Sequence, residues 1–277
     1  MAHLLRRLLH TIFVLWAIAT ILFLMFRLLP GDPATAYIDP TFTAAERAQV
    51  LHQFGLDRPL WTQYVVYFGD LARGQLGLSF RYRQPVLGLI FGVLPNTLLL
   101  TLTALIVAYV FGALAGALLA WKRGTLFEAV TIPLLLATRA APEFWLGMVL
   151  LAVFAFGLGW FPAGGANAAG SEYHSGLARI LSLDFARHLV LPAATLALFL
   201  QGLPALLMRS NMLEVMQEEF VTMARMKGLS EWTVMVRHAA RNALLPLVTA
   251  FALGFGLSVG GNVVIETVFS WPGLGRM

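Results

Sequence analysis

The sequence predicts an all-α polytopic membrane protein, and three observations carry this prediction. Hydrophobic residues make up 59% of the 277 residues. Charged residues make up only 12%, whereas a typical soluble domain has about 25%. The apolar residues form several runs of about 20 residues, the length of a helix that crosses a bilayer. Such runs predict helices, because a spanning segment must satisfy its backbone hydrogen bonds internally.

The residue types exclude several kinds of chemistry. The chain has no cysteine, so it has no disulfide framework and no thiolate metal site. Its histidines are scattered without metal-binding spacing, and it contains no phosphate-binding loop and no nucleophile motif. We therefore expect no catalytic residue, no metal site and no cofactor bound by this chain. The net charge of +5 fits basic loops at a membrane better than nucleic-acid binding.

The first span is predicted at Leu8–Phe26, with Arg27 reaching toward the far interface. Arg6 and Arg7 precede it, which favours a cytoplasmic amino terminus. A cleaved signal peptide is the alternative, but the apolar run is too long and no small-residue cleavage site follows. Pro30, with the glycine and proline after it, is expected to end the helix.

The sequence predicts three regions. Residues 1–28 hold the amino-terminal end and first span, 29–96 form an outer segment with short helices, and 97–277 form the core. In the outer segment, Thr43 and Glu46 fit a capping box. Gly55 fits the end of that helix, and Pro59 fits the start of the next.

One face of this second outer helix is apolar and aromatic. We expect it to pack against the spans, with a landing surface for an external partner as the alternative. The face consists of Trp61, Tyr64, Val65 and Phe68.

The second span is predicted at Thr97–Trp121. Its Gly112 and Gly116 form a small-xxx-small pattern that lets two helix backbones approach closely. We expect the neighbouring helix to come from this chain, and a helix of another chain is the alternative. The basic pair after this span, Lys122 and Arg123, predicts a short cytoplasmic loop.

Residues 127–161 predict a broken helix, with Pro133 and Pro142, followed by a third span at Arg139–Trp160. Arg139 and Glu143 are four residues apart, so they are expected to pair on one helix face. We expect both at the inner interface, although an ionisable residue within a span is otherwise a functional candidate.

The fourth and fifth spans are predicted at Leu189–Met208 and Ala243–Val268. Gln201 is expected to bond between helices, with a place in the transport pathway as the alternative. The fifth span is rich in glycine, and its Asn262 and Glu266 are expected near the outer end. Five spans place the carboxyl terminus outside the cell.

Between these two spans lies a polar segment, Arg209–Pro246. It predicts helix up to Lys227, a break at Gly228 and a second helix from Glu231. Ser230 fits the cap of that second helix. A solvated loop is the simpler interpretation, but such loops seldom expose several apolar side chains together. A surface for another protein's groove fits better, with these apolar contacts: Met223, Ala224, Met226 and Leu229.

The run EEFVTMARMKGLS…VRHAARNALLPLVT resembles the cytoplasmic coupling loop of ABC importer permeases, in the branch that handles dipeptides, oligopeptides and nickel. The resemblance extends along nearly the whole chain in the family's order. The further matching motifs are LLPGDP (28–33), FGLDRPLWTQY (54–64), GQLGLSF (74–80), PEFWLG (142–147) and ETVFSWPGLGR (266–276).

The resemblance implies the fold of a type I ABC importer membrane domain in a bacterial or archaeal plasma membrane. It implies a heterodimer with a second permease subunit, two cytoplasmic ATPase subunits that hold ATP and magnesium, an extracytoplasmic substrate-binding protein, and surrounding lipids. The core then includes a coupling loop at 209–243. The implied ATPase contacts are Glu219, Phe220, Ala224, Arg225, Lys227, Gly228, Leu229 and Ser230, and the residues implied to brace the loop are His238, Arg241, Asn242 and Pro246.

The sequence departs from the general pattern at two places. His238 to Arg241 stand where permeases commonly have an I-x-L-P-like segment, which is the peptide-branch form. Members of the family continue through a sixth span, whereas this sequence ends at Met277, so we expect it to be a piece of a longer protein. Peptide is the expected substrate and nickel the alternative. An ion-coupled carrier or a membrane scaffold is less consistent with the coupling loop.

Overall fold

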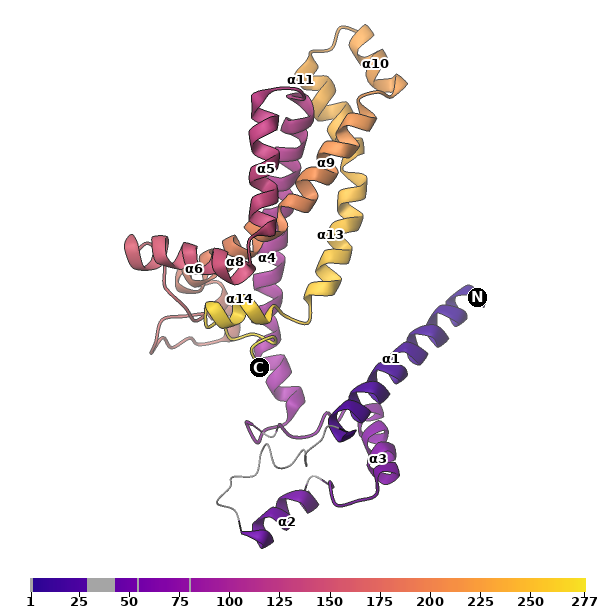
Figure 1. Cartoon of the computed structure of the whole chain (residues 1–277), viewed down its shortest axis with the longest axis vertical. Coiled ribbons are helices and arrows are strands. Elements are labelled where there is room, and N and C mark those ends of the chain that lie inside the picture. Colours follow the sequence, from indigo (N-terminus) through magenta and orange to yellow (C-terminus); the bar gives the residue numbers. More distant parts are fainter. Residues whose placement is uncertain (1, 29–42, 54, 80) are drawn as a thin grey trace. The chain divides into compact units, whose positions relative to one another are not determined.

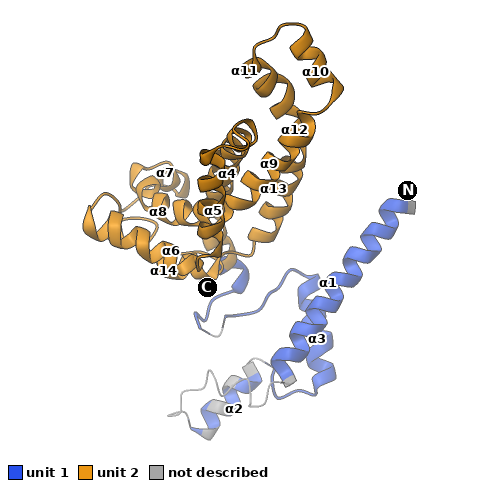
Figure 2. Ribbon diagram, turned by 45° about the horizontal axis from the view of Figure 1, so that its top comes forward, with its two compact units in different colours: residues 1–89 blue, residues 90–277 orange. Residues whose placement is uncertain are grey.

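The computed structural model describes residues 2–28, 43–53, 55–79 and 81–277. They belong to two compact units, Met1–Leu89 and Ile90–Met277 (Figure 2). Regular structure in these described ranges is helical, which confirms the all-α fold class. Three helices there are long and apolar enough to cross a membrane, or up to five if each of two bent helix pairs counts as one span.

The first unit contains α1 (Ala2–Leu28), α2 (Ala44–Gln53) and α3 (Leu60–Ala72). Helix α1 confirms the first span, and the residues expected to end it, Pro30 to Pro33, lie outside the described ranges. Tyr64 of α3 packs edge-on against Phe23 of α1, and its hydroxyl lies 2.9 Å from the hydroxyl of Thr20. The aromatic face of α3 thus packs on the first span, while Trp61 remains 73% exposed.

Local sequence signals set the ends of α2 and α3 as predicted. The backbone N–H of Thr43 donates to Glu46 at 2.7 Å, and the N–H of Glu46 donates to the Thr43 hydroxyl at 3.3 Å. Gly55 has a φ of 62° and its N–H donates to the His52 carbonyl, which ends the preceding helix as glycine commonly does. Helix α3 begins directly after Pro59.

Helix α4 (Val86–Trp121) crosses the boundary between the two units. Its first residues belong to the first unit, and the second unit begins within it at Ile90. It continues with α5 (Leu126–Ala140), α6 (Glu143–Leu150), the π-helix η1 (Leu151–Gly157), α7 (Gly176–Ile180), α8 (Leu183–Leu200), α9 (Gly202–Val215), α10 (Glu219–Met226), α11 (Glu231–Thr233), the π-helix η2 (Val234–Ala240), α12 (Arg241–Ala243), α13 (Leu245–Ser258) and α14 (Val263–Val268).

Two predicted spans have different boundaries in the structure. Helix α4 begins at Val86 instead of Thr97 and continues through Pro95, which membrane helices tolerate when neighbours satisfy the freed carbonyl. The third span is broken at Ala141, and the chain bends by 102° between α5 and the α6–η1 pair.

The predicted pairing of Arg139 with Glu143 is wrong, because this bend places them on different helices. The carboxylate of Glu143 accepts a hydrogen bond from the Asn262 side chain at 2.6 Å. Asn262 precedes α14, so Glu143 connects α6 with the carboxyl-terminal end of the chain. Helix α5 separates Glu143 from the loop at Lys122, and the placement of Arg139 and Glu143 at the inner interface stays a prediction.

The fourth and fifth spans are also interrupted. The fourth region begins at Leu183, where the Ser182 hydroxyl accepts the N–H of Phe185, and it breaks at Gln201 between α8 and α9. The fifth ends at Ser258, and a turn with Gly261 at a φ of 91° leads into α14. Asn262 caps α14 by accepting the N–H of Ile265.

Helices α4 and α9 approach closely at the small residues of α4. A Cβ atom built at Gly112 would lie 2.8 Å from the Pro204 ring and 2.9 Å from the Gln201 carbonyl oxygen. At Gly116 it would collide with the Ala205 carbonyl oxygen. The prediction that the small-xxx-small pattern meets a helix of the same chain is confirmed.

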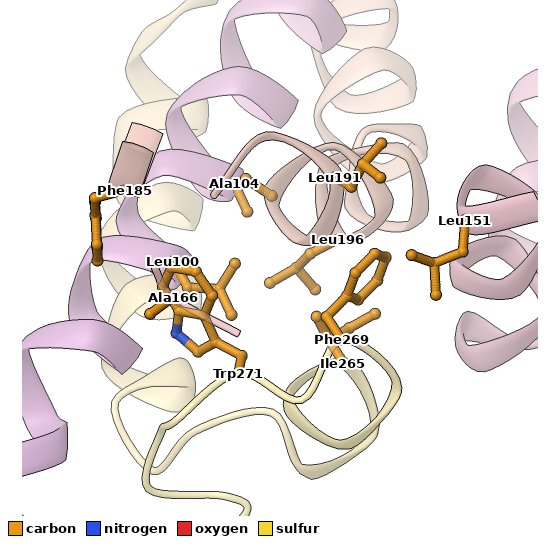
Figure 3. Packing of buried hydrophobic residues seen from close by; sticks show 11 residues of the cluster. Leu100, Ala104, Leu151, Ala166, Phe185, Leu191, Leu196, Ile265, Phe269 and Trp271 are labelled. Atoms are coloured by element: carbon orange, nitrogen blue, oxygen red, sulfur yellow. The ribbon is translucent and has the colours of Figure 1, made fainter. Parts of the chain in front are cut away.

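A hydrophobic core surrounds the carboxyl-terminal segment (Figure 3). Trp271, Phe269 and Ile265 are almost fully buried among residues from α4, α6, η1 and α8. The carboxylate of Glu266, also without exposure, accepts the Thr97 hydroxyl and the Arg276 N–H, each at 2.9 Å. The motif ETVFSWPGLGR thus fastens the end of the described chain to the start of the core.

Candidate coupling surface

The segment from Met216 to Thr233 projects from one end of the second unit. In Figure 1, α10 and α11 lie at this end, while α6, α8 and α14 gather at the other. Helix α9 leads into the segment, and η2 with α12 and α13 leads out of it. The two limbs contact each other, and the Asn211 side chain donates to the Ala243 carbonyl at 3.3 Å. The projecting segment is therefore supported on both sides.

The predicted helix–glycine–helix is confirmed in its local geometry. Helix α10 ends at Met226, and Gly228 follows with a φ of 75° and its N–H bonded to the Arg225 carbonyl at 2.9 Å. L-residues with a Cβ atom are strained in this conformation. The Ser230 hydroxyl accepts the Thr233 N–H at 3.3 Å. Gly228 therefore reverses the chain, and Ser230 starts the next helix.

One break in this segment was not predicted. The sequence indicates continuous helix up to Lys227, but α9 ends at Val215 and α10 begins at Glu219. Glu218 has extended backbone, and its side chain makes no capping bond. No glycine or proline marks this turn. The bend instead allows Val221 of α10 to pack into the same core as Met212 of α9.

The inner face of α10 anchors the segment. Val221 is fully buried and Ala224 is 5% exposed, and both belong to a cluster with Met212, Val234 and Ala239. Ala224 had been expected at the partner contact. The structure places it on the opposite face, where it fixes α10 to the body of the unit.

The outer face of α10 is apolar and open. Met226 is 82% exposed and Met223 is 59% exposed. Phe220 at the start of the helix and Leu229 after its end are each about 40% exposed. Unbranched methionine side chains adapt to irregular neighbouring surfaces. We name this set the coupling surface: Phe220, Met223, Met226 and Leu229.

Charged residues border the coupling surface. Arg225 donates through Nε to the Glu231 carboxylate at 3.0 Å, so this guanidinium joins α10 to α11. Glu219 lies in the first turn of α10, where the positive end of the helix dipole stabilises a negative charge. Lys227 is exposed directly after the helix. An apolar face with charged edges is typical of a protein–protein contact.

The residues expected to brace the loop make mostly local contacts. Asn242 donates to the His238 carbonyl at 2.9 Å, while Arg241 and Pro246 are exposed. The bracing comes instead from buried residues on the other face of η2, α12 and α13. The sequence signal for them was an apolar pattern at near-helical spacing: Val234, Met235, Ala239, Ala243 and Leu247.

This arrangement is suited to docking another protein. In the described ranges, no group of three or more His, Cys, Asp or Glu residues could hold a metal ion. The coupling surface presents sulfur and hydrocarbon atoms, which supply contact area but no acid, base or nucleophile.

Two protein families match the chain. Residues 108–277 match the family described as the inner membrane component of binding-protein-dependent transport systems. Residues 1–101 match the amino-terminal region of membrane components of the same systems. The chain belongs to this family of transport permeases. The match includes the coupling surface and both helical limbs that support it.

Known permeases match along nearly the whole chain. A di/tripeptide permease of Pseudomonas aeruginosa is 39% identical over 98% of this chain and 84% of its own length. An oligopeptide permease of Bacillus subtilis is 37% identical, covering 100% of this chain and 85% of the relative. A glutathione permease of Escherichia coli O6:H1 is 36% identical, covering 99% and 84%. The resemblance to ABC importer permeases of the peptide branch is confirmed.

Proposed function

We propose that this permease forms half of the translocation pathway of an ATP-driven importer for dipeptides or oligopeptides. Its coupling surface enters a groove on a cytoplasmic ATPase subunit, so the α10–α11 end is cytoplasmic. The basic residues Arg6 and Arg7 independently favour a cytoplasmic amino terminus. A second, distinct permease supplies the other half of the pathway. A second ATPase subunit and an extracytoplasmic binding protein complete the assembly in a bacterial plasma membrane.

The observation that carries this proposal is the two-faced character of α10. Val221 and Ala224 bury one face in the permease core, while Met223 and Met226 leave the other open. A helix held this firmly on one side transmits displacement to the core. An ATPase that binds the two access states differently can then shift the equilibrium between them.

Peptide is the proposed substrate because the three relatives are named for di/tripeptide, oligopeptide and glutathione transport. Nickel remains an outcome of the test, because the sequence resemblance includes that branch. An ion-coupled carrier has no need of a surface that docks an ATPase.

Reconstitution tests this proposal. The full assembly is placed in proteoliposomes with the binding protein outside and ATP–Mg inside, and uptake of a labelled peptide mixture is compared with uptake of radioactive nickel. We expect peptide uptake that requires ATP. Uptake of nickel alone would overturn the peptide assignment, and uptake driven by an ion gradient without ATP would overturn the importer mechanism.

A further inference from the structure

We propose that Glu128 and Arg209 form a positioning pair that makes the coupling loop move together with the α4–α5 corner of the core. This inference rests on the proposed function, because it concerns how motion at the coupling surface reaches the pathway. It assigns a role to an ion pair that lies outside the coupling surface.

The pair joins segments that are far apart in the sequence. Arg209 of α9 donates through Nε to the Glu128 carboxylate at 2.7 Å, and its Nη2 contacts the same oxygen. The other carboxylate oxygen accepts the N–H of Gly124 at 2.7 Å. Glu128 thus holds both the loop between α4 and α5 and the side of α9. The side chains are only 12% and 26% exposed, so water screens the pair less than it screens a surface pair.

Arg209 lies in the helix that leads directly into α10, which carries the proposed ATPase contact. Helix α9 continues from Arg209 to Val215, and only Met216 to Glu218 separate it from α10. This connection is hydrogen bonded, since the N–H groups of Gln217 and Glu218 donate to carbonyls at the end of α9. Because this connection is short and hydrogen bonded, a displacement of α10 also displaces α9.

Packing around the pair holds α9 close against α4. A Cβ atom built at Gly116 would lie 3.0 Å from the Arg209 backbone nitrogen and 2.7 Å from the Met208 Cβ. Trp121, at the end of α4, packs on Trp232 of α11 with ring centroids 5.7 Å apart. Contacts of this kind hold the helices together, but apolar surfaces do not fix their register as directed ionic hydrogen bonds do.

The mechanical consequence follows from these contacts. With the pair intact, a displacement of α10 moves α9 and the α4–α5 corner together. Without it, α9 can shift or rotate against α4 while the coupling surface stays docked. ATP hydrolysis then continues, but less of it is converted into transport. The signature is therefore a changed ratio of transport to hydrolysis, which a simple loss of stability does not produce.

The test uses the assembled transporter in proteoliposomes and measures peptide imported per ATP hydrolysed. For Glu128→Gln we expect this ratio to fall by about twofold to thirtyfold, the effect of mutations along a coupled network, with ATPase association unchanged. The double reversal E128R/R209E restores part of the ratio. Asp70→Asn is the matched control, because Asp70 pairs with Arg73 at 4.0 Å on the exposed side of α3, and it leaves the ratio unchanged.

The outcomes separate the two proposals. An unchanged ratio in E128Q, with normal wild-type transport, overturns the positioning role and leaves the proposed function standing. A wild-type assembly without ATP-driven uptake overturns the proposed function itself. If E128Q does not assemble, Arg209→Lys replaces it, because lysine keeps the charge but lacks the Nε donor. An unchanged ratio in R209K would then count against the pair.

Discussion

At the residue scale, Met223 and Ala224 are neighbours with opposite environments. Met223 is 59% exposed, whereas Ala224 is 5% exposed. The motif around them therefore combines two tasks that the sequence does not separate. Residues on the Ala224 face fix the helix to the permease, and residues on the Met223 face remain open to a partner. A substitution on the first face should affect stability, and one on the second should affect association.

Gly228 provides a test of the chain reversal. Proline fixes φ near −65° and has no N–H, whereas Gly228 has a φ of 75° and donates to Arg225. We expect Gly228→Pro to abolish ATP-driven uptake while membrane insertion persists. Uptake in proteoliposomes and the amount of inserted protein are measured together.

Gly170→Pro is the matched control for this variant. Gly170 has a φ of 81°, and no atom lies near the position of a Cβ, so the backbone strain is comparable but far from the coupling surface. Normal uptake by the Gly228 variant would refute the role of the turn. Equal losses in both variants would show that the effect is not specific to the coupling loop.

Glu46 provides a prediction about pH. The N–H and hydroxyl of Thr43 donate to its carboxylate and lower the pKa of Glu46 below the ordinary value. The contribution of this cap to α2 is therefore present above the unfolded pKa of about 4.3, and it is lost as the pH falls through the lowered folded value. Carbon-13 NMR titration of the labelled protein should give Glu46 a lower pKa than in Thr43→Ala. Identical titration curves would show that the Thr43 hydroxyl does not lower the pKa of Glu46.

At the element scale, the contact between α4 and α9 sets the position of both limbs of the coupling loop. Gly116 has no room for a side chain, because the Ala205 carbonyl occupies the space. Gly116→Val should lower the free energy of unfolding by about 1–3 kcal/mol, the usual cost of overpacking. Thermal unfolding in detergent measures the effect.

Gly92→Ala is the control for Gly116→Val. Gly92 lies in the same helix with no atom near the position of a Cβ. Alanine favours helix over glycine by about 1 kcal/mol, so this variant should be unchanged or slightly more stable. If Gly116→Val were as stable as the control, the close approach of α9 to α4 would be wrong.

Local signals made some elements predictable from the sequence. The capping box at Thr43, the glycine turn at Gly228 and the cap at Ser230 depend on neighbouring residues, and the structure confirms each one. The small-xxx-small pattern also predicted a close helix contact, because its small residues are themselves a local signal. The sequence did not identify the partner helix, which the structure shows to be α9.

Helix breaks were harder to predict. The fifth span was predicted to continue through Gly260 and Gly261 to Val268, but these glycines form a turn and Asn262 caps α14. Gly202 and Pro204 could have indicated the break at Gln201. The turn at Met216–Glu218 has no such signal, because it follows from burying Val221 beside Met212. Tertiary packing decided that position, and the composition of the coupling surface alone did not show which of its residues face inward.

At the scale of the whole molecule, the second unit has two differently constructed ends. At one end, Glu266, Trp271 and the carboxyl-terminal segment form a buried network around Thr97. At the other, the coupling surface exposes apolar side chains on a well-anchored helix. In the proposed importer, the first end holds the fold together, while the second receives work from the ATPase. The central claim is that the coupling surface is covered by an ATPase subunit in the assembly.

The chain has no cysteine, so a single introduced cysteine tests this claim directly. Met226→Cys and the control Leu181→Cys replace similarly exposed side chains, at 82% and 76%, on α10 and beyond the end of α7. A short reagent that joins this thiol to a nearby amine of another subunit is applied to the assembled transporter. We expect the thiol of the Met226→Cys variant to be cross-linked to the ATPase subunit and the thiol of the control not to be. A Met226→Cys thiol that reacts freely with a water-soluble reagent and is never cross-linked to the ATPase would contradict it.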